Sequence, residues 1–234
     1  MQKKFFIFGL ACLLSLAFMT VTWAYNPGQR TYNLIGNILN SSKQPVHVEI
    51  EQRLDLAEIL KPEAYSLLKE NQRQKLTTYE YNELSADHYS QRVISRDAGG
   101  ALLKDMNFVV RDGYFYAIDN IAHTYDRLPN IPGLSKSFTQ GLVQWFNEKP
   151  EAGADELSEE DYDLFTLGKR SIKIYFQSGT DKWLGYQIGM LAPHRVIAYN
   201  QQVDEGALAL PPEDYQLTAN EAIRAQANRL TLKK

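Results

Sequence analysis

Residues 107–118 read Asn-Phe-Val-Val-Arg-Asp-Gly-Tyr-Phe-Tyr-Ala-Ile, and this stretch decides the class of fold. Asp112-Gly113 is a dipeptide favoured at a two-residue type I′ turn, so the sequence predicts a β-hairpin with arms at 107–111 and 114–118. Both arms are apolar on both faces. The hairpin is therefore expected either within a sheet that is covered on each side, or with one face lining a cavity.

Strand patterns continue on both sides of this hairpin. Residues 46–51 alternate strictly between apolar and polar side chains, which is typical of a half-buried strand. A turn at Asp119-Asn120 leads into a third strand, so the central strands are expected to follow one another as a meander. The further strand-like segments are 77–97, 123–127, 172–176, 184–188 and 195–199.

Helical patterns fall before, between and after the strands. Pro62 fits the first turn of a helix over 61–70, and Ser137 with Gln140 forms a capping box at the start of a helix over 137–147. Further helices are predicted at 31–39, 158–168 and 220–230, the second of them closed by Gly168. Together these patterns predict an α+β fold, in which helices cover one face of a strongly curved antiparallel sheet, a half-barrel-like meander.

The amino terminus carries the pattern of a secretory signal peptide. Lys3 and Lys4 precede an uncharged, largely apolar stretch at 5–21, and Thr22-Trp23-Ala24 offers small residues where a signal peptidase cleaves. We expect cleavage after Ala24, which leaves residues 25–234 as one domain in the periplasm or outside the cell, with no stable membrane span. The alternative is an uncleaved anchor, because roughly 17 apolar residues are at the lower limit for crossing a bilayer.

Cysteine content and charge exclude several classes of partner. Cys12 is the only cysteine and lies within the signal segment, so the mature chain has no disulfide. Removal of Lys3 and Lys4 leaves 23 of the 25 basic residues against 28 acidic ones, a net charge of −5. An acidic surface argues against nucleic acid, which calls for a basic stripe. It also argues against electrostatic binding to anionic lipid headgroups.

No motif indicates catalysis, a metal or a cofactor. His47 and Glu49 lie on the same side of one expected strand, but no second pair of ligands has metal-site spacing. The chain has no Gly-x-Ser-x-Gly nucleophile motif, and Gly99-Gly100 lacks the spacing of a phosphate-binding loop. We therefore expect a protein that is not an enzyme. Two carboxylates far apart in sequence keep glycan hydrolysis open as a weaker alternative.

The strands supply more apolar surface than one small sheet usually buries. In one interpretation, helices 31–39, 61–70 and 137–147 cover all of it and form a packed core. In the other, part of it lines a groove for an acyl chain or another apolar ligand. The candidate ligand-binding residues are Phe108, Val110, Tyr114, Tyr116, Ile118, Ile172, Ile174, Phe176, Leu184, Tyr186 and Ile188.

One family resemblance bears on this choice. Residues 105–129 run strand, Asp-Gly turn, tyrosine-rich strand, short turn, then His-Thr-Tyr-Asp-Arg-Leu-Pro. With Lys-Trp-Leu-Gly-Tyr at 182–186 and Pro-His-Arg-Val-Ile-Ala-Tyr at 193–199, this order resembles the LolA-like superfamily of exported lipoprotein carriers over roughly residues 46–200. The resemblance implies a strongly bent antiparallel half-barrel, with helices as a lid over an apolar cavity for lipid tails.

Two features depart from that family pattern: the expected helix at 61–70, and the tail beyond Asp204 with its two adjacent prolines. The resemblance implies a non-enzymatic carrier or binding protein whose partner is a lipid or a lipidated protein. The alternative is a protein–protein interaction module of the cell envelope, in which the same sheet forms a solid core without a cavity.

Overall fold

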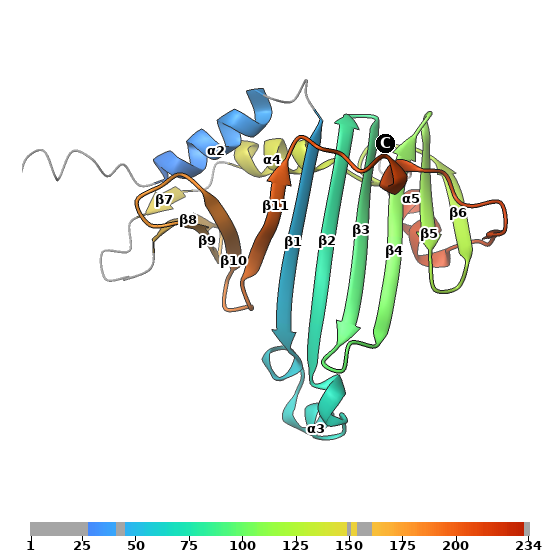
Figure 1. The fold of residues 1–234 in the computed structure, drawn as a ribbon, viewed down its shortest axis with the longest axis horizontal. Helices are drawn as coiled ribbons and strands as arrows, with labels where there is room; N and C mark the ends of the chain where they lie inside the picture. Colours follow the sequence, from blue (N-terminus) through green and yellow to red (C-terminus); the bar gives the residue numbers. More distant parts are fainter. Residues whose placement is uncertain (1–27, 41–44, 149–150, 154–160, 232–234) are drawn as a thin grey trace, which may run out of the picture.

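A computed structural model describes residues 28–40, 45–148, 151–153 and 161–231 as one large open β-sheet with a few helices (Figure 1). The expected signal peptide at 1–24 lies outside these ranges. Within them, the sheet has twelve strands in the order β12-β6-β5-β4-β3-β2-β1-β11-β10-β9-β8-β7. In the described part of the chain, no helix has the length and apolarity needed to cross a membrane. The predicted antiparallel sheet with helices is confirmed.

The first six strands form one antiparallel meander. They are β1 (Val46–Asp55), β2 (Gln74–Ser85), β3 (His88–Asp97), β4 (Leu102–Arg111), β5 (Tyr114–Asp119) and β6 (Thr124–Pro129). Between β4 and β5, Asp112 and Gly113 have φ angles of 53° and 78°. Positive φ at both central residues defines the type I′ turn that the Asp-Gly dipeptide predicts.

A second antiparallel meander follows. It consists of β7 (Glu151–Gly153), β8 (Tyr162–Leu167), β9 (Arg170–Phe176), β10 (Trp183–Ile188) and β11 (His194–Asn200). Strand β11 pairs with β1, which joins the two meanders into one sheet, and β12 (Gln216–Leu217) pairs in parallel with β6 at the far edge.

The helix predicted at 158–168 is wrong where it can be compared, because residues 162–167 form strand β8; Ser158 lies outside the described residues. The apolar side chains of Tyr162 and Phe165 fit a helical spacing, but both are buried as residues of a strand that pairs with β9. Gly168 has a φ of 61° and closes the β8–β9 hairpin. A left-handed glycine serves a hairpin turn as well as a helix end, so the local signal is ambiguous.

Four α-helices are described: α2 (Gln29–Asn40), α3 (Pro62–Ser66), α4 (Phe138–Asn147) and α5 (Glu221–Thr231). The helix predicted at 61–70 starts as expected at Pro62 but ends after five residues. It buries no residue, and Leu67 just beyond it is 85% exposed. Because the helix has no buried apolar stripe, it does not pack on the sheet. It projects instead at the tip of the β1–β2 connection, between the short 3₁₀ helices η1 (Leu56–Glu58) and η2 (Glu70–Gln72) (Figure 1).

The other three helices pack on one face of the sheet, called here the helix face. On this face Phe138 of α4 packs with Val48 and Ile50, and Ile223 of α5 packs with Val110. Residues 201–215, called here the strap, cross the opposite face and include the short helix η3 (Glu205–Leu208). Figure 1 shows the strap passing in front of β1–β4 and α5 lying behind β5.

The strap is fixed to its face by polar and apolar contacts. Asn107 on β4 donates a hydrogen bond of 2.9 Å from Nδ2 to the carbonyl oxygen of Ala207. Tyr215 packs against a cluster formed by Val109, Tyr116 and Ile118. The hairpin of residues 107–118 is therefore covered on both faces, by α5 on one and by the strap on the other.

The two meanders meet at an irregular junction. Strands β10 and β11 pair at only two positions, Gly185 with Arg195 and Tyr186 with His194. Gly185 has a φ of 154°, and a Cβ atom there would lie 2.0 Å from the carbonyl oxygen of His194. On the other side of β10, its register with β9 shifts between Trp183 and Gly185. Only glycine fits this approach of one backbone to another.

A strand-borne carboxylate fixes α5 to the sheet. Asp126 of β6 is buried and accepts a 2.8 Å hydrogen bond from the backbone N–H of Asn220, just before the helix. Arg224 donates two further hydrogen bonds of 2.8 Å to the same carboxylate. Negative charge at a helix amino terminus is stabilising, and the arginine offsets its burial.

Candidate ligand-binding pocket

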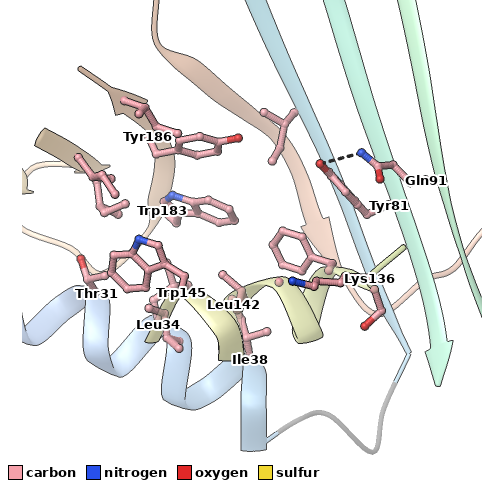
Figure 2. A pocket seen from close by; sticks show the side chains of 18 residues that line it. Thr31, Leu34, Ile38, Tyr81, Gln91, Lys136, Leu142, Trp145, Trp183 and Tyr186 are labelled. Carbon is pink, nitrogen blue, oxygen red and sulfur yellow. Dashed lines mark hydrogen bonds between the residues drawn. The ribbon is translucent and has the colours of Figure 1, made fainter. Parts of the chain in front are cut away.

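A pocket of about 370 Å³ lies between the helix face and helices α2 and α4 (Figure 2). Residues from five strands and two helices, with the two residues before α4, form its wall. They are Thr31, Leu34, Ile35, Ile38, Ile50, Tyr81, Gln91, Lys136, Ser137, Phe138, Gly141, Leu142, Trp145, Ile172, Ile174, Trp183, Tyr186 and Ile188.

The periodicity of each element places its apolar residues in this wall. On β9 and β10, Ile172 pairs with Ile188 and Ile174 pairs with Tyr186, so all four side chains leave the sheet on the same side. On α2 the lining residues Leu34 and Ile38 are one turn apart, as are Phe138 and Leu142 on α4. The pocket is thus a gap between an apolar strand surface and two apolar helix stripes.

A buried carboxylate holds the start of α2 against β8. Asp163 accepts hydrogen bonds from the backbone N–H of Thr31 at 3.0 Å and from its hydroxyl at 2.7 Å. Arg30 forms ion pairs with Asp161 and Asp163, and its guanidinium lies 4.6 Å from the centre of the Phe176 ring. These contacts fix one end of the helix that forms one wall of the pocket.

A second buried carboxylate holds the start of α4 against β2. Glu83 accepts hydrogen bonds from the Ser137 hydroxyl at 2.8 Å and from the Thr139 backbone N–H at 3.0 Å. The predicted capping box is confirmed, because Ser137 and Gln140 exchange hydrogen bonds of 3.0 and 3.2 Å. This anchoring explains why α4 begins where the sequence indicates.

Two tyrosine hydroxyls reach into the largely apolar pocket. Burial raises the pKa of Tyr81 to about 12 and raises the pKa of Tyr186 even further. Both phenols are therefore protonated at neutral pH and able to donate a hydrogen bond. Gln91 donates from Nε2 to the Tyr81 oxygen at 3.3 Å, as the dashed line in Figure 2 shows.

His194 of β11 lies directly beneath Tyr186. Their rings are stacked, with centroids 4.4 Å apart and an interplanar angle of 6°. Burial lowers the pKa of His194, so the ring is neutral at physiological pH. The ring makes no ion pair with any described residue, and it acts as packing beneath the pocket wall.

The structure brings four of the eleven sequence-derived candidates together in the pocket: Ile172, Ile174, Tyr186 and Ile188. The other candidates lie elsewhere. Phe108 and Val110 are in the packed cluster beneath α5, and Tyr114, Tyr116 and Ile118 are in the cluster on the strap face. Phe176 is buried beneath Arg30, and Leu184 is 40% exposed.

Several lining residues are absent from the sequence-derived set. Phe138, Leu142 and Trp145 lie on the helix predicted over residues 137–147, so their place on a helix was predictable, whereas the cavity that they face was not. Tyr81 and Ile50 follow the apolar–polar alternation of their strands, which does not distinguish them from the other residues on the same face. Their place in the pocket depends on the pairing of β1 with β11, which no local pattern reveals.

No metal-binding cluster was found among the described residues, where no group of three His, Cys, Asp or Glu side chains converges. His47, one of the residues considered for a metal, has its Nδ1 within 2.9 Å of the side-chain oxygen of Asn82. That amide oxygen also accepts a hydrogen bond from the backbone N–H of Asp204 at 3.0 Å. The contact fastens the start of the strap.

Comparisons with known proteins do not assign the chain to a family. No family model matches the chain, and no curated protein matches it. An uncharacterized conserved protein from Thermus thermophilus is similar in structure, with 12% identity and a TM-score of 0.44 over 82% of this chain and 100% of that one. PNGF-II is similar with 9% identity and a TM-score of 0.25, over 81% of this chain and 34% of that one. Neither similarity supports an argument about function, and the LolA-like resemblance stays a prediction.

Proposed function

We propose that this protein is a non-enzymatic, exported binding protein that holds the apolar part of a lipid or a lipidated protein in the pocket beneath α2 and α4. The observation that carries the proposal is the pocket itself, with its volume of about 370 Å³ and its wall of aliphatic and aromatic side chains. Ligand sites of this kind typically measure roughly 300–1,000 Å³ and carry a few placed polar groups.

The chemistry of the wall favours an apolar ligand. An alkyl chain that enters displaces water from aliphatic and aromatic surface, which stabilises the complex by roughly 25 cal/mol per Å² buried. Of the described residues in the wall, Lys136 alone carries a formal charge, and it lies exposed before α4. An apolar chain therefore meets no buried charge along the wall.

The proposal includes a particular form of the sheet and a way for the ligand to reach the pocket. The sheet is a half-barrel that wraps around the pocket, and the register shifts where β1 pairs with β11 and where β10 pairs with β9 bend it on either side of the β10–β11 junction. Helix α2 acts as the lid. Asp163 fixes its amino end through contacts with Thr31 and Arg30, so the rest of the helix is the part that moves. The ligand enters when the remainder of α2 moves away from α4.

One observation favours the alternative of an interaction module. Leu67 beyond α3 and Met190 in the β10–β11 turn are 85% and 97% exposed. Large exposed apolar patches mark contacts with partner proteins, and a partner at these residues would bury both side chains. In that function the pocket would stay empty, so its occupancy separates the two candidates.

Native mass spectrometry of the protein purified after export tests the proposal, with solvent extraction to identify any bound molecule. The informative variant is Gly141→Leu, because Gly141 lines the pocket and a Cβ atom there meets nothing within 4 Å. The added side chain fills the pocket without removing any contact. The matched control is Gly36→Leu on α2, where a Cβ also meets open space but does not face the pocket wall.

The proposal predicts a co-purifying apolar molecule in the wild-type protein and in Gly36→Leu, and its loss in Gly141→Leu. An unliganded mass for all three proteins, together with no uptake of a fluorescent fatty acid, would favour the interaction module. In that case the exposed residues around Leu67 and Met190 become the surface to test.

A further inference from the structure

We infer that the ligand is an apolar chain bearing an uncharged hydrogen-bond acceptor, such as an ester or amide carbonyl, which the hydroxyls of Tyr81 and Tyr186 bind. This inference rests on the proposed function, because it assigns chemistry to the ligand of the same pocket. It adds a polar recognition point and a preference for neutral acyl groups over free carboxylates.

The two hydroxyls converge from strands that are not neighbours. Tyr81 is on β2 and Tyr186 on β10, with β1 and β11 between them in the sheet. Both residues line the pocket, and Figure 2 shows their hydroxyl groups directed into it from its two sides. A carbonyl between them can therefore accept from either phenol.

Each phenol has a proton to donate. Gln91 donates to the oxygen of Tyr81, which leaves the Tyr81 proton free for an acceptor in the pocket. The Tyr186 hydroxyl has no hydrogen bond to a described residue of the protein. The Tyr186 hydroxyl is open to the pocket, so a hydrogen-bond partner for it has to come from there. A ligand carbonyl supplies one that the protein does not.

The charges around the pocket disfavour a carboxylate at this point. The ammonium group of Lys136 is hydrogen bonded to the side chain of Gln144 on the outer side of α4. Arg30 is paired with Asp161 and Asp163, and the ring of His194 is neutral because burial lowers its pKa. A carboxylate beside the two tyrosines would lose its water without gaining a cation, which is unfavourable.

A displacement assay tests the inference. The exported protein binds the apolar fluorescent probe N-phenyl-1-naphthylamine, which is then displaced by methyl decanoate, N-methyldecanamide, decanoate or decane at pH 7. The ester and the amide should bind roughly fivefold more tightly than decane, the effect of about one net hydrogen bond. Decanoate should bind more weakly than the ester.

Conservative variants assign the effect to the two hydroxyls. Tyr81→Phe and Tyr186→Phe should each reduce the preference for ester and amide while leaving the affinity for decane unchanged. Tyr114→Phe is the matched control, because Tyr114 lies on the strap face and outside the pocket. Thermal unfolding of each variant verifies that the fold is retained.

The outcomes separate this inference from the function on which it rests. If neither the probe nor any of the four ligands binds, the proposed function fails and the inference fails with it. If decane or decanoate binds as tightly as the ester, and the two phenylalanine variants behave as wild type, the pocket binds apolar chains but the tyrosines do not select a carbonyl. That result overturns the inference alone.

Discussion

The two ends of the helix face differ in what lies beneath their helices. At one end, Ile223, Ala227 and Leu230 of α5 pack directly on the strand residues and Leu134, and this end is called here the solid end. At the other end, α2 and α4 stand over a pocket of about 370 Å³. The same sheet face therefore carries a packed core and an open site side by side.

The way in which the helices are fastened does not explain this difference. Asp126, Asp163 and Glu83 each bind the start of one helix from a strand. The side chains between helix and sheet do differ. Ala227 of α5 packs directly on the strand cluster, whereas beneath α2 and α4 the rings of Trp145 and Trp183 line the pocket.

The largest expected difference between the two ends is in the cost of truncating a leucine. Leu134→Ala removes a side chain from the solid end and should lower the free energy of unfolding by about 3 kcal/mol. Leu142→Ala should cost only about 1 kcal/mol, since part of its side chain already faces the pocket. Urea unfolding measures both. Equal losses would mean that the pocket end is packed as tightly as the α5 end.

The contribution of the Asp126 carboxylate, at the solid end, to the free energy of unfolding should depend on pH. Hydrogen bonds from Arg224 hold the pKa of Asp126 below its usual value. Its contribution to stability is thus complete above the ordinary carboxyl pKa of about 4 and is lost as the pH falls through the lowered value. Asp126→Asn should destabilise the protein at pH 7, and the difference from wild type should shrink below about pH 4.

The binding of an apolar probe can be compared between this variant and the corresponding variant at the pocket end. Asp126→Asn should leave the binding of an apolar probe unchanged, because α5 does not touch the pocket. Asp163→Asn should weaken binding, because Asp163 positions Thr31 and with it the α2 wall. A loss of binding in Asp126→Asn of the same size would show that the two ends are not independent.

The smallest expected effect is a gain in stability. Gly141→Ala and Gly36→Ala each place a methyl group in open space on a helix. Each should raise the free energy of unfolding by roughly 0.5–1 kcal/mol, because glycine is unfavourable inside a helix. A loss of stability at Gly141 alone would indicate that the space beneath α4 is filled in solution.

The sequence predicted the features whose physical cause is local. The type I′ turn follows from two adjacent residues, Asp112 and Gly113, and the capping box of α4 from Ser137 and Gln140. Strand β8 was missed because Tyr162, Phe165 and Gly168 satisfy a helix pattern and a hairpin pattern equally well. Pairing with β9 decides between them, and pairing is not a local property.

The candidate site was only partly predictable for the same reason. Alternation identifies which residues of a strand are buried, but it does not identify the element that covers them. Ile174 and Val110 look alike in sequence, yet one faces the pocket and the other faces α5. The difference depends on the pairing of β1 with β11, whose partners Glu51 and Arg195 lie far apart along the chain.

The most direct test of the pocket as a binding site uses the protein's own tryptophans. Of the three, Trp145 and Trp183 both line the pocket. Trp23 belongs to the expected signal peptide, and in a protein that retains this segment the variant Trp23→Phe removes its fluorescence. Titration with methyl 9,10-dibromostearate should quench their fluorescence to saturation, because bromine quenches only at short range. Quenching should persist in Gly36→Leu and disappear in Gly141→Leu. Quenching that is absent, or that is unchanged in Gly141→Leu, would contradict a ligand-binding pocket beneath α2 and α4.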